Sequence, residues 1–295
     1  ITQYLNQQFM KNILKAIFIS VFPAFSLYIL IDSILHLAEH DFSNRYLGRL
    51  IIGLSIVLFF AGLFLKPTAR TSRNLVVFTS IITIGFIISV FVGGIYENQD
   101  LFGSSMSTLL FLGWWLYIKW YSVFEKRDKN ILKVGNLLPN FEVEDISKNK
   151  INSSSFIGRP AIYLFYRGNW CPLCMAQIKE IANQYKELEK RGVAMNFISP
   201  QPHQYSNSLA EKYQLGFNFL VDANNKAAKQ LGIFSKNGIP FGFQVMKYES
   251  DTVMPTVVIT NSKGEIIFTD LTDNYRVRPE PETFLRVLDA MNDNK

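Results

Sequence analysis

The sequence predicts a chain of two parts, a segment of four membrane-spanning helices followed by an α/β domain. Three observations predict this division. The first 123 residues carry only 13 charged side chains, whereas the remaining 172 residues carry 41. The first part contains four long apolar runs, each bounded by charged residues. In the second part, short apolar stretches alternate with helical patterns, which is typical of domains that combine helices with a buried sheet.

The four apolar runs lie at residues 16–31, 50–65, 74–96 and 101–118. A helix needs about 20 apolar residues to cross a bilayer. The first two runs are slightly short, but basic side chains at their ends can extend to the lipid–water interface. We therefore expect residues 1–123 to form a multi-pass membrane anchor whose partner is the lipid bilayer. A role in transport or electron transfer is the alternative for this half.

The charges between the runs predict the orientation of the anchor, because Lys and Arg in short loops stay on the cytoplasmic side. Lys66, Arg70 and Arg73 follow the second run, with no acidic residue among them. Glu97 and Asp100 follow the third run instead. We expect an integral protein of a bacterial inner membrane with both termini, and so the α/β domain, in the cytoplasm.

A charged linker at 124–133 is expected to separate the anchor from the α/β domain at 134–295. A short hairpin is predicted within 141–150. Strands are predicted at 161–166, 193–198, 217–221, 256–260 and 265–269, and helices at 172–190, 204–213, 224–231 and 280–291. Gly192 marks the end of the first of these helices, since glycine readily follows a helix terminus.

The composition excludes several classes of protein. Two cysteines are too few for a disulfide-stabilised scaffold, and 48% hydrophobic residues exclude a disordered chain. The net charge of +6 is small, and in the first half the basic residues lie between apolar runs. A nucleic acid is therefore not an expected partner. The composition does not indicate the oligomeric state.

Both cysteines lie in one Cys-x-x-Cys motif, where the first buried strand meets a helix. Cys171 is expected at the N-cap, with Pro172 at the first helical position, where a missing N–H is tolerated. The helix N-terminus stabilises an anion, so Cys171 is predicted to have the lower pKa and to act as the nucleophile. Cys174, one turn on, would then form a disulfide with it. A zinc site lacks two ligands, and a pair of inert core cysteines is the other alternative.

Residues 134–292 resemble the peroxiredoxin-like branch of the alkyl hydroperoxide reductase/thiol-specific antioxidant group, within the thioredoxin superfamily. The resemblance rests on Gly135-x-x-x-Pro139-x-Phe141, on residues 165–174, 198–200 and 273–282, and on the strand after Pro255. It implies a thioredoxin-like fold with a central mixed sheet. It also implies reduction of a peroxide or a disulfide, an external thiol reductant such as thioredoxin, and no metal or organic cofactor.

The resemblance also gives expectations for single residues. Pro255 is expected in a cis-proline loop that faces the cysteines, with an ordinary trans proline before an edge strand as the alternative. Arg167 is expected to stabilise the thiolate or a peroxide oxygen, with a solvated loop arginine as the alternative. Arg276 and Arg278 are weaker candidates, expected mainly at the surface.

One departure from the family pattern affects the predicted activity. Family members carry a Thr three residues before the reactive Cys, but Gly168 stands three residues before Cys171, and Cys171 three before Cys174. Thiol–disulfide exchange on protein substrates is therefore the closest alternative to peroxide reduction. A membrane redox sensor without turnover is the third possibility.

Overall fold

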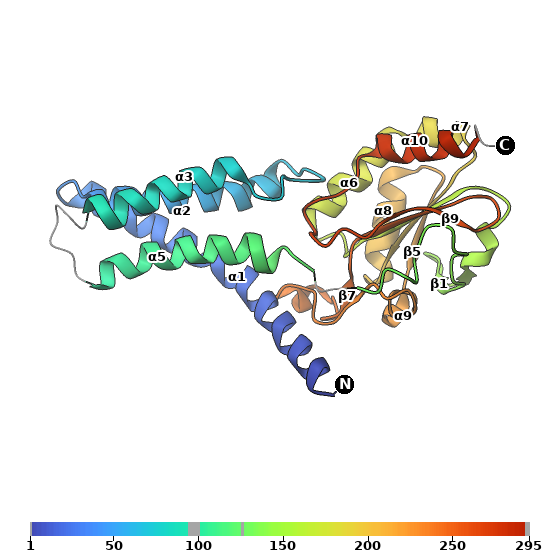
Figure 1. Cartoon of the computed structure of the whole chain (residues 1–295), viewed down its shortest axis with the longest axis horizontal. Helices are drawn as coiled ribbons and strands as arrows, with labels where there is room; N and C mark the ends of the chain where they lie inside the picture. Colours follow the sequence, from blue (N-terminus) through green and yellow to red (C-terminus); the bar gives the residue numbers. More distant parts are fainter. Residues whose placement is uncertain (1, 94–100, 125–126, 293–295) are drawn as a thin grey trace. The chain divides into compact units, whose positions relative to one another are not determined.

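The computed structural model describes residues 2–93, 101–124 and 127–292, and they form two compact units (Figure 1). The helical unit comprises residues 14–67 and 71–123, and the sheet unit comprises 1–13, 68–70 and 124–295. Glu97 and Asp100, which follow the third predicted run, lie outside the described residues, and so do residues 125 and 126 of the predicted linker.

Helices are found at all four predicted apolar runs. They are α1 (Thr2–Glu39), α2 (Asn44–Leu65), α3 (Val76–Ile87) and α5 (Leu101–Leu116), and the last two continue as π-helical segments, η1 (Ile88–Val92) and η2 (Tyr117–Tyr121). Within the described residues, Met10–Glu39 and α2 are long and apolar enough to cross a membrane, whereas Val76–Val92 is a shorter apolar helix. Two such helices are weak evidence, so the four predicted crossings stay a prediction.

Small residues allow the helices of the helical unit to pack closely. A Cβ atom added to Gly48 of α2 would lie 2.5 Å from the backbone oxygen of Gly85 on α3. The hydroxyl groups of Ser89 and Ser107 are 2.5 Å apart in the buried interior. Such close contacts are typical of helices that associate in a bilayer, where burial of apolar surface alone does not drive packing.

A seven-stranded sheet in the order β2-β1-β5-β4-β3-β8-β9 forms the centre of the sheet unit. Its strands are β1 (Glu142–Glu144), β2 (Lys150–Asn152), β3 (Ala161–Phe165), β4 (Ala194–Ser199), β5 (Phe217–Val221), β8 (Thr256–Thr260) and β9 (Ile266–Asp270). Strands β3, β4 and β5 run parallel to one another. Strand β8 is antiparallel to both β3 and β9, and β1 is antiparallel to β5. The predicted central mixed sheet is therefore confirmed. A separate pair, β6 (Phe234–Ser235) and β7 (Thr252–Val253), lies outside it.

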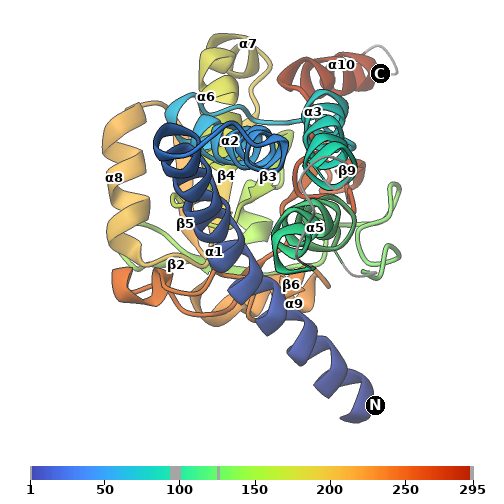
Figure 2. The same cartoon turned by 90° about the vertical axis from the view of Figure 1, so that its left-hand side faces the viewer.

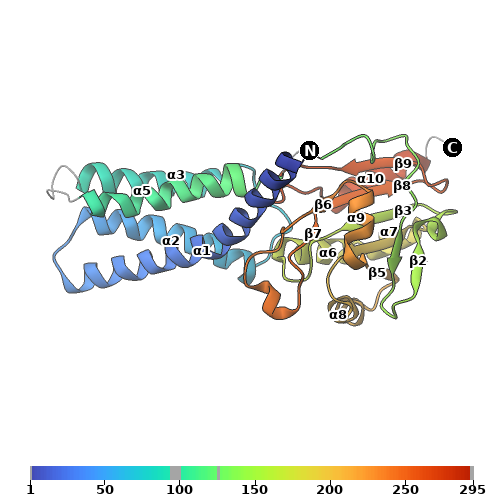
Figure 3. The ribbon, with the colours of Figure 1, turned by 90° about the horizontal axis from the view of Figure 1, so that it is seen from below.

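Helices cover both faces of this sheet. They are α6 (Pro172–Asn183), α7 (Tyr185–Lys190), α8 (His203–Tyr213), α9 (Lys226–Gln230) and α10 (Pro281–Asn292). On one face, Phe268 of β9 packs against Phe284 of α10. On the other face, Tyr163 and Phe165 of β3 share a core cluster with Leu231, next to α9. Figure 2 shows α6, α7 and α10 on the side opposite α9, and Figure 3 shows α9 in front of the strands.

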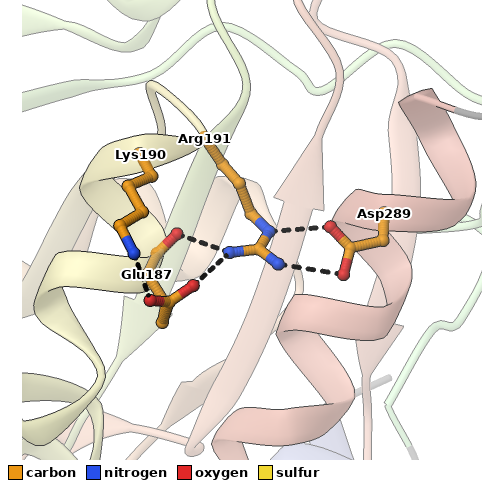
Figure 4. Close-up of polar contacts among 4 residues, drawn as sticks. All are labelled: Glu187, Lys190, Arg191 and Asp289. Carbon is orange, nitrogen blue, oxygen red and sulfur yellow. Dashed lines mark hydrogen bonds and ion pairs between the residues drawn. The ribbon is translucent and has the colours of Figure 1, made fainter.

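The predicted helix at 172–190 is divided into α6 and α7. Gln184 leaves the helical region with φ −96° and ψ 10°. Its backbone N–H donates to Ile181, three residues earlier, which tightens the last turn of α6. Arg191, directly after α7, then forms a two-pronged pair with Asp289 of α10 at 2.7 and 3.0 Å and also contacts Glu187 (Figure 4). This network connects α7 to α10 on the same face of the sheet.

The connectivity around β3 is that of a thioredoxin-like fold. Strand β3 leads through α6 and α7 to the parallel strand β4, and the antiparallel strands β8 and β9 lead to α10. All five residues of β3 are buried, as expected for a strand covered on both faces. The Cys-x-x-Cys motif therefore follows the carboxyl end of a central strand.

Candidate active site

The Cys-x-x-Cys motif forms the start of α6, as predicted. Cys171 is the N-cap residue, with extended backbone, and its Sγ accepts a hydrogen bond from the backbone N–H of Cys174 at 3.4 Å. Pro172 occupies the first turn. Gly168, in the loop before the motif, has φ +149°, and a Cβ atom there would lie 2.7 Å from the Trp170 ring. This loop therefore needs glycine.

The two thiols are buried and adjacent. Both cysteines are free, and Cys171 and Cys174 are only 2% and 0% exposed. Their Sγ atoms lie 2.7 Å apart, within hydrogen-bond distance. One turn of helix therefore presents a compact dithiol that can interconvert with a disulfide.

A guanidinium group lies against both sulfur atoms. Arg278 Nη2 is 3.4 Å from Cys174 Sγ and 4.0 Å from Cys171 Sγ, and its Nη1 donates to Gln177 Oε1 at 2.9 Å. Arg278 is buried, and so is Arg276. The predicted surface position of these two arginines is therefore wrong, because the segment between β9 and α10 packs against the first turns of α6.

Arg278 lowers the pKa of both thiols, and the hydrogen bond between the two sulfur atoms separates their pKa values. Burial alone would raise the pKa of the Cys174 thiol, but the hydrogen bond between Cys174 and Cys171 and the positive charge of Arg278 outweigh burial and hold this pKa well below its usual range. Burial and the adjoining Cys174 raise the pKa of the Cys171 thiol well above its usual range. These directions put the lower pKa on Cys174 and the higher one on Cys171, whereas the helix N-terminus predicts the opposite order. The roles of the two cysteines stay a prediction.

Arg167 has other partners. Its guanidinium donates to the carbonyl oxygen of Gly238 and lies over the Trp170 ring at 4.7 Å. Its own carbonyl oxygen accepts a hydrogen bond from Thr252 at 3.0 Å. These contacts connect the loop that precedes the motif to residues 238–252. The predicted role of Arg167 at a thiolate or peroxide oxygen stays a prediction.

Pro255 does not have the predicted cis bond, since the described residues contain no cis peptide. The prediction is therefore wrong at this position. Pro255 directly precedes β8, whose first residue, Thr256, pairs with Phe165 at the end of β3. A proline ahead of the strand removes no ladder hydrogen bond, so a trans proline is accommodated there.

Several polar residues near the motif carry no local sequence signal. Gln201 Oε1 accepts the backbone N–H of Asn169 at 2.8 Å, and Gln201 Nε2 donates to the Tyr166 hydroxyl at 3.0 Å. The Tyr248 hydroxyl donates to the Asn169 side chain. Phe243 lies 5.2 Å from the Trp170 ring, measured between ring centroids. The loop before the dithiol is thus held from two sides, by the segment after β4 and by residues 238–248.

Residues 134–269 match the AhpC/TSA family. The AhpC/TSA match includes both cysteines, Arg167 and Pro255, but Arg278 lies beyond its end. It covers no part of the helical unit. Among the described residues, no three His, Cys, Asp or Glu side chains gather as they would around a metal ion.

Relatives of the AhpC/TSA segment are named peroxiredoxins. Peroxiredoxin Bcp of Escherichia coli (strain K12) is 26% identical over 141 residues, which are 48% of this chain and 88% of that protein. The chloroplastic peroxiredoxin Q of Triticum aestivum is 30% identical over 99 residues, 34% of this chain, and the chain spans only 46% of that relative. These names support an enzyme of the peroxiredoxin class.

Solved structures also resemble the segment. AhpC of Enterococcus faecalis has 16% identity, covers 54% of this chain and 92% of its own, and has a TM-score of 0.45. Peroxidoxin BcpB of Mycobacterium tuberculosis has 19% identity, covers 54% of this chain and 98% of its own, and has a TM-score of 0.44.

Proposed function

We propose that the sheet unit reduces peroxides, with Cys174 as the attacking thiolate. The observation that carries the proposal is the buried Arg278 guanidinium, 3.4 Å from Cys174 Sγ. Thiolate is the nucleophilic form of cysteine. The sulfur attacks the O–O bond and takes one oxygen as a sulfenic acid, while the other oxygen leaves as hydroxide or an alkoxide and takes a proton from water to become water or an alcohol. Arg278 stabilises first the thiolate and then the charge that develops on the leaving oxygen.

Cys171 is the resolving residue in this proposal. Its sulfur attacks the sulfenic sulfur of Cys174, the S–S bond forms, and the sulfenic oxygen leaves as water with the Cys171 proton. An external dithiol protein of the thioredoxin kind then reduces the disulfide. In this assignment, Cys171 stands at the position where family members carry a Thr, three residues before the reactive cysteine.

Thiol–disulfide exchange on protein substrates is the second candidate function. It is favoured by the thiol that replaces the Thr hydroxyl and by the 2.7 Å separation of the two sulfur atoms. Both functions use the same residues, but they differ in which oxidant reacts at a useful rate. A sensor without turnover would be oxidised only stoichiometrically.

We also propose that residues 1–123 anchor the chain in a bilayer by four crossings, with 124–133 as a linker and the domain at 134–295 in the cytoplasm. Two of the helices have the required length and hydropathy. The helical unit also exposes large apolar side chains, for example Leu58, Phe64, Leu65 and Val77, each more than half exposed. An apolar surface of this kind suits lipid better than water. A C-terminal alkaline phosphatase fusion is expected to be inactive, and a fluorescent-protein fusion bright.

The test of the enzymatic proposal uses the full chain in lipid nanodiscs, with hydrogen peroxide as oxidant and thioredoxin, its reductase and NADPH as the reducing system. Cys174→Ser is expected to abolish NADPH consumption. Cys171→Ser is expected to stop turnover but to leave a sulfenic acid on Cys174 that dimedone traps. Dimedone trapped on Cys171 in the Cys174→Ser variant would contradict the assignment of the two roles. Rapid oxidation by a protein disulfide, with slow oxidation by peroxide, would favour the second function.

A further inference from the structure

Arg70 belongs to the segment that connects α2 to α3, yet residues 68–70 are part of the sheet unit. The neighbouring Ala69 is buried, 1% exposed. The Arg70 guanidinium forms a two-pronged pair with Glu180, with Nη1 at 3.4 Å from Oε1 and Nη2 in contact with Oε2. Its Nε also donates to the carbonyl oxygen of Arg278 at 3.2 Å, and Nη2 to that of Pro279 at 3.3 Å.

These partners come from the two elements that make up the dithiol site. Glu180 lies on α6, the helix whose first turn carries Cys174. Arg278 presents its guanidinium to Cys174 and its carbonyl oxygen to Arg70. Arg70 therefore binds the helix of the thiol and the backbone of the arginine at the same time.

We propose that Arg70 is a positioning residue that holds Arg278 against the reactive thiol. Gln177 binds the guanidinium end of Arg278, and Arg70 binds its backbone end. The proposal rests on the proposed role of Arg278 as the partner of the Cys174 thiolate.

Arg70 acts through position rather than through its own charge. Its side chain is 27% exposed and that of Glu180 is 36% exposed, so solvent screens the charge of the pair. Arg278, in contrast, is buried, and its interaction with the thiolate weakens as the distance between them grows. Without the hydrogen bonds from Arg70 to the carbonyl oxygens of Arg278 and Pro279, the segment between β9 and α10 would move away from α6. The guanidinium would then be farther from Cys174, and the thiolate less stable.

The test measures the thiol directly, in the full chain in nanodiscs. A Cys171→Ser background leaves Cys174 as the single thiol, and its alkylation by iodoacetamide is followed from acid to alkaline pH. Arg70→Ala is expected to raise the apparent pKa of Cys174 by about one unit, which lowers the alkylation rate at acid pH about tenfold. Arg70→Lys keeps the positive charge but loses the planar group that binds two acceptors at once. Its apparent Cys174 pKa is expected to lie between those of Arg70→Ala and the parent.

Two further variants keep the test decisive. Glu180→Gln removes the ion pair from the α6 side and is expected to shift the pKa in the same direction. Arg70→Glu combined with Glu180→Arg restores a pair and is expected to recover part of the shift. Arg73→Ala is the matched control, because it removes an exposed positive charge from the same connecting segment, and it is expected to leave the profile unchanged.

If both Arg70→Ala and Glu180→Gln left the pH dependence of Cys174 alkylation unchanged, the proposal would be overturned. Arg70 and Glu180 would then form only a surface ion pair. An equal shift in Arg73→Ala would also overturn it, by indicating a general effect of charge. Because alkylation needs no peroxide, failure of the proposed peroxide reduction would be seen separately, as absent turnover in the unmodified chain.

Discussion

The start of α6 and the segment between β9 and α10 meet at the dithiol, but they differ in how much their own sequence reveals. The start of α6 has clear local signals: an apolar strand, a glycine loop, an N-cap cysteine and a proline. The other segment has no periodic pattern, and its two arginines look like surface residues of a loop. Yet it supplies the positive charge that lowers the pKa of both thiols and lies nearer to Cys174. Local sequence thus predicts where the thiols lie, whereas the positive charge beside Cys174 comes from a residue 104 positions away.

Removal of that charge is expected to have the largest effect. Arg278→Met keeps a long apolar side chain but leaves the Cys174 thiolate without its positive partner. We expect the rate of peroxide reduction near neutral pH to fall by about 10²–10³-fold, the range found when one electrostatic donor is lost from an active site. The thioredoxin-coupled assay measures this rate. Arg278→Lys keeps a positive charge but loses the planar guanidinium, so its rate of peroxide reduction should be intermediate. A normal rate in Arg278→Met would mean that the arginine is only structural.

The pH dependence of thiol labelling in the unmodified chain tests which of the two cysteines carries the thiolate. Because the pKa of Cys174 is lowered and that of Cys171 is raised, iodoacetamide should label Cys174 first at neutral and mildly acid pH. The rate should fall as the pH drops through the lowered pKa, since the thiolate is then protonated. Mass spectrometry of the digested chain identifies the labelled residue. Labelling of Cys171 first would restore the order predicted from the helix N-terminus.

The elements of the sheet unit could be predicted because each depends on a local pattern. The apolar stretches of β3, β4, β5, β8 and β9 are bounded by turn residues, and their predicted limits agree with the structure to within one or two residues. The division of the predicted helix at Gln184 could not be foreseen, since it depends on how α7 packs. The burial of Arg278 depends likewise on packing between segments distant in the chain. For the helical unit, composition predicts helices, but the number of crossings depends on the bilayer.

A smaller effect is expected at Gln177, whose side-chain oxygen accepts a hydrogen bond from the Arg278 guanidinium. Gln177→Ala removes one hydrogen bond to the guanidinium, and such a bond to a charged group contributes about 1.5–3 kcal/mol. The charge remains, so we expect a smaller rise in the pKa of Cys174 than Arg278→Met produces. The alkylation profile measures it. Lys179→Ala, an exposed change on the same helix, is the control, and an equal shift in both variants would contradict a specific role of Gln177.

The smallest effect is expected at Pro255, which lies beside the end of β3 but supplies neither a thiol nor a charge. Its peptide bond is trans and it precedes the first ladder pair of β8, Thr256 with Phe165. An alanine can adopt the same backbone conformation, so Pro255→Ala should change stability mainly by making the unfolded chain more flexible. The expected loss is about 0.4–1 kcal/mol, measured by denaturant unfolding. Peroxide turnover and the pKa of Cys174 should stay close to those of the parent, because neither the α6 N-terminus nor Arg278 is altered. A large loss of turnover in a folded Pro255→Ala variant would mean that a third region, the β7–β8 connection, takes part in the site alongside the two compared here.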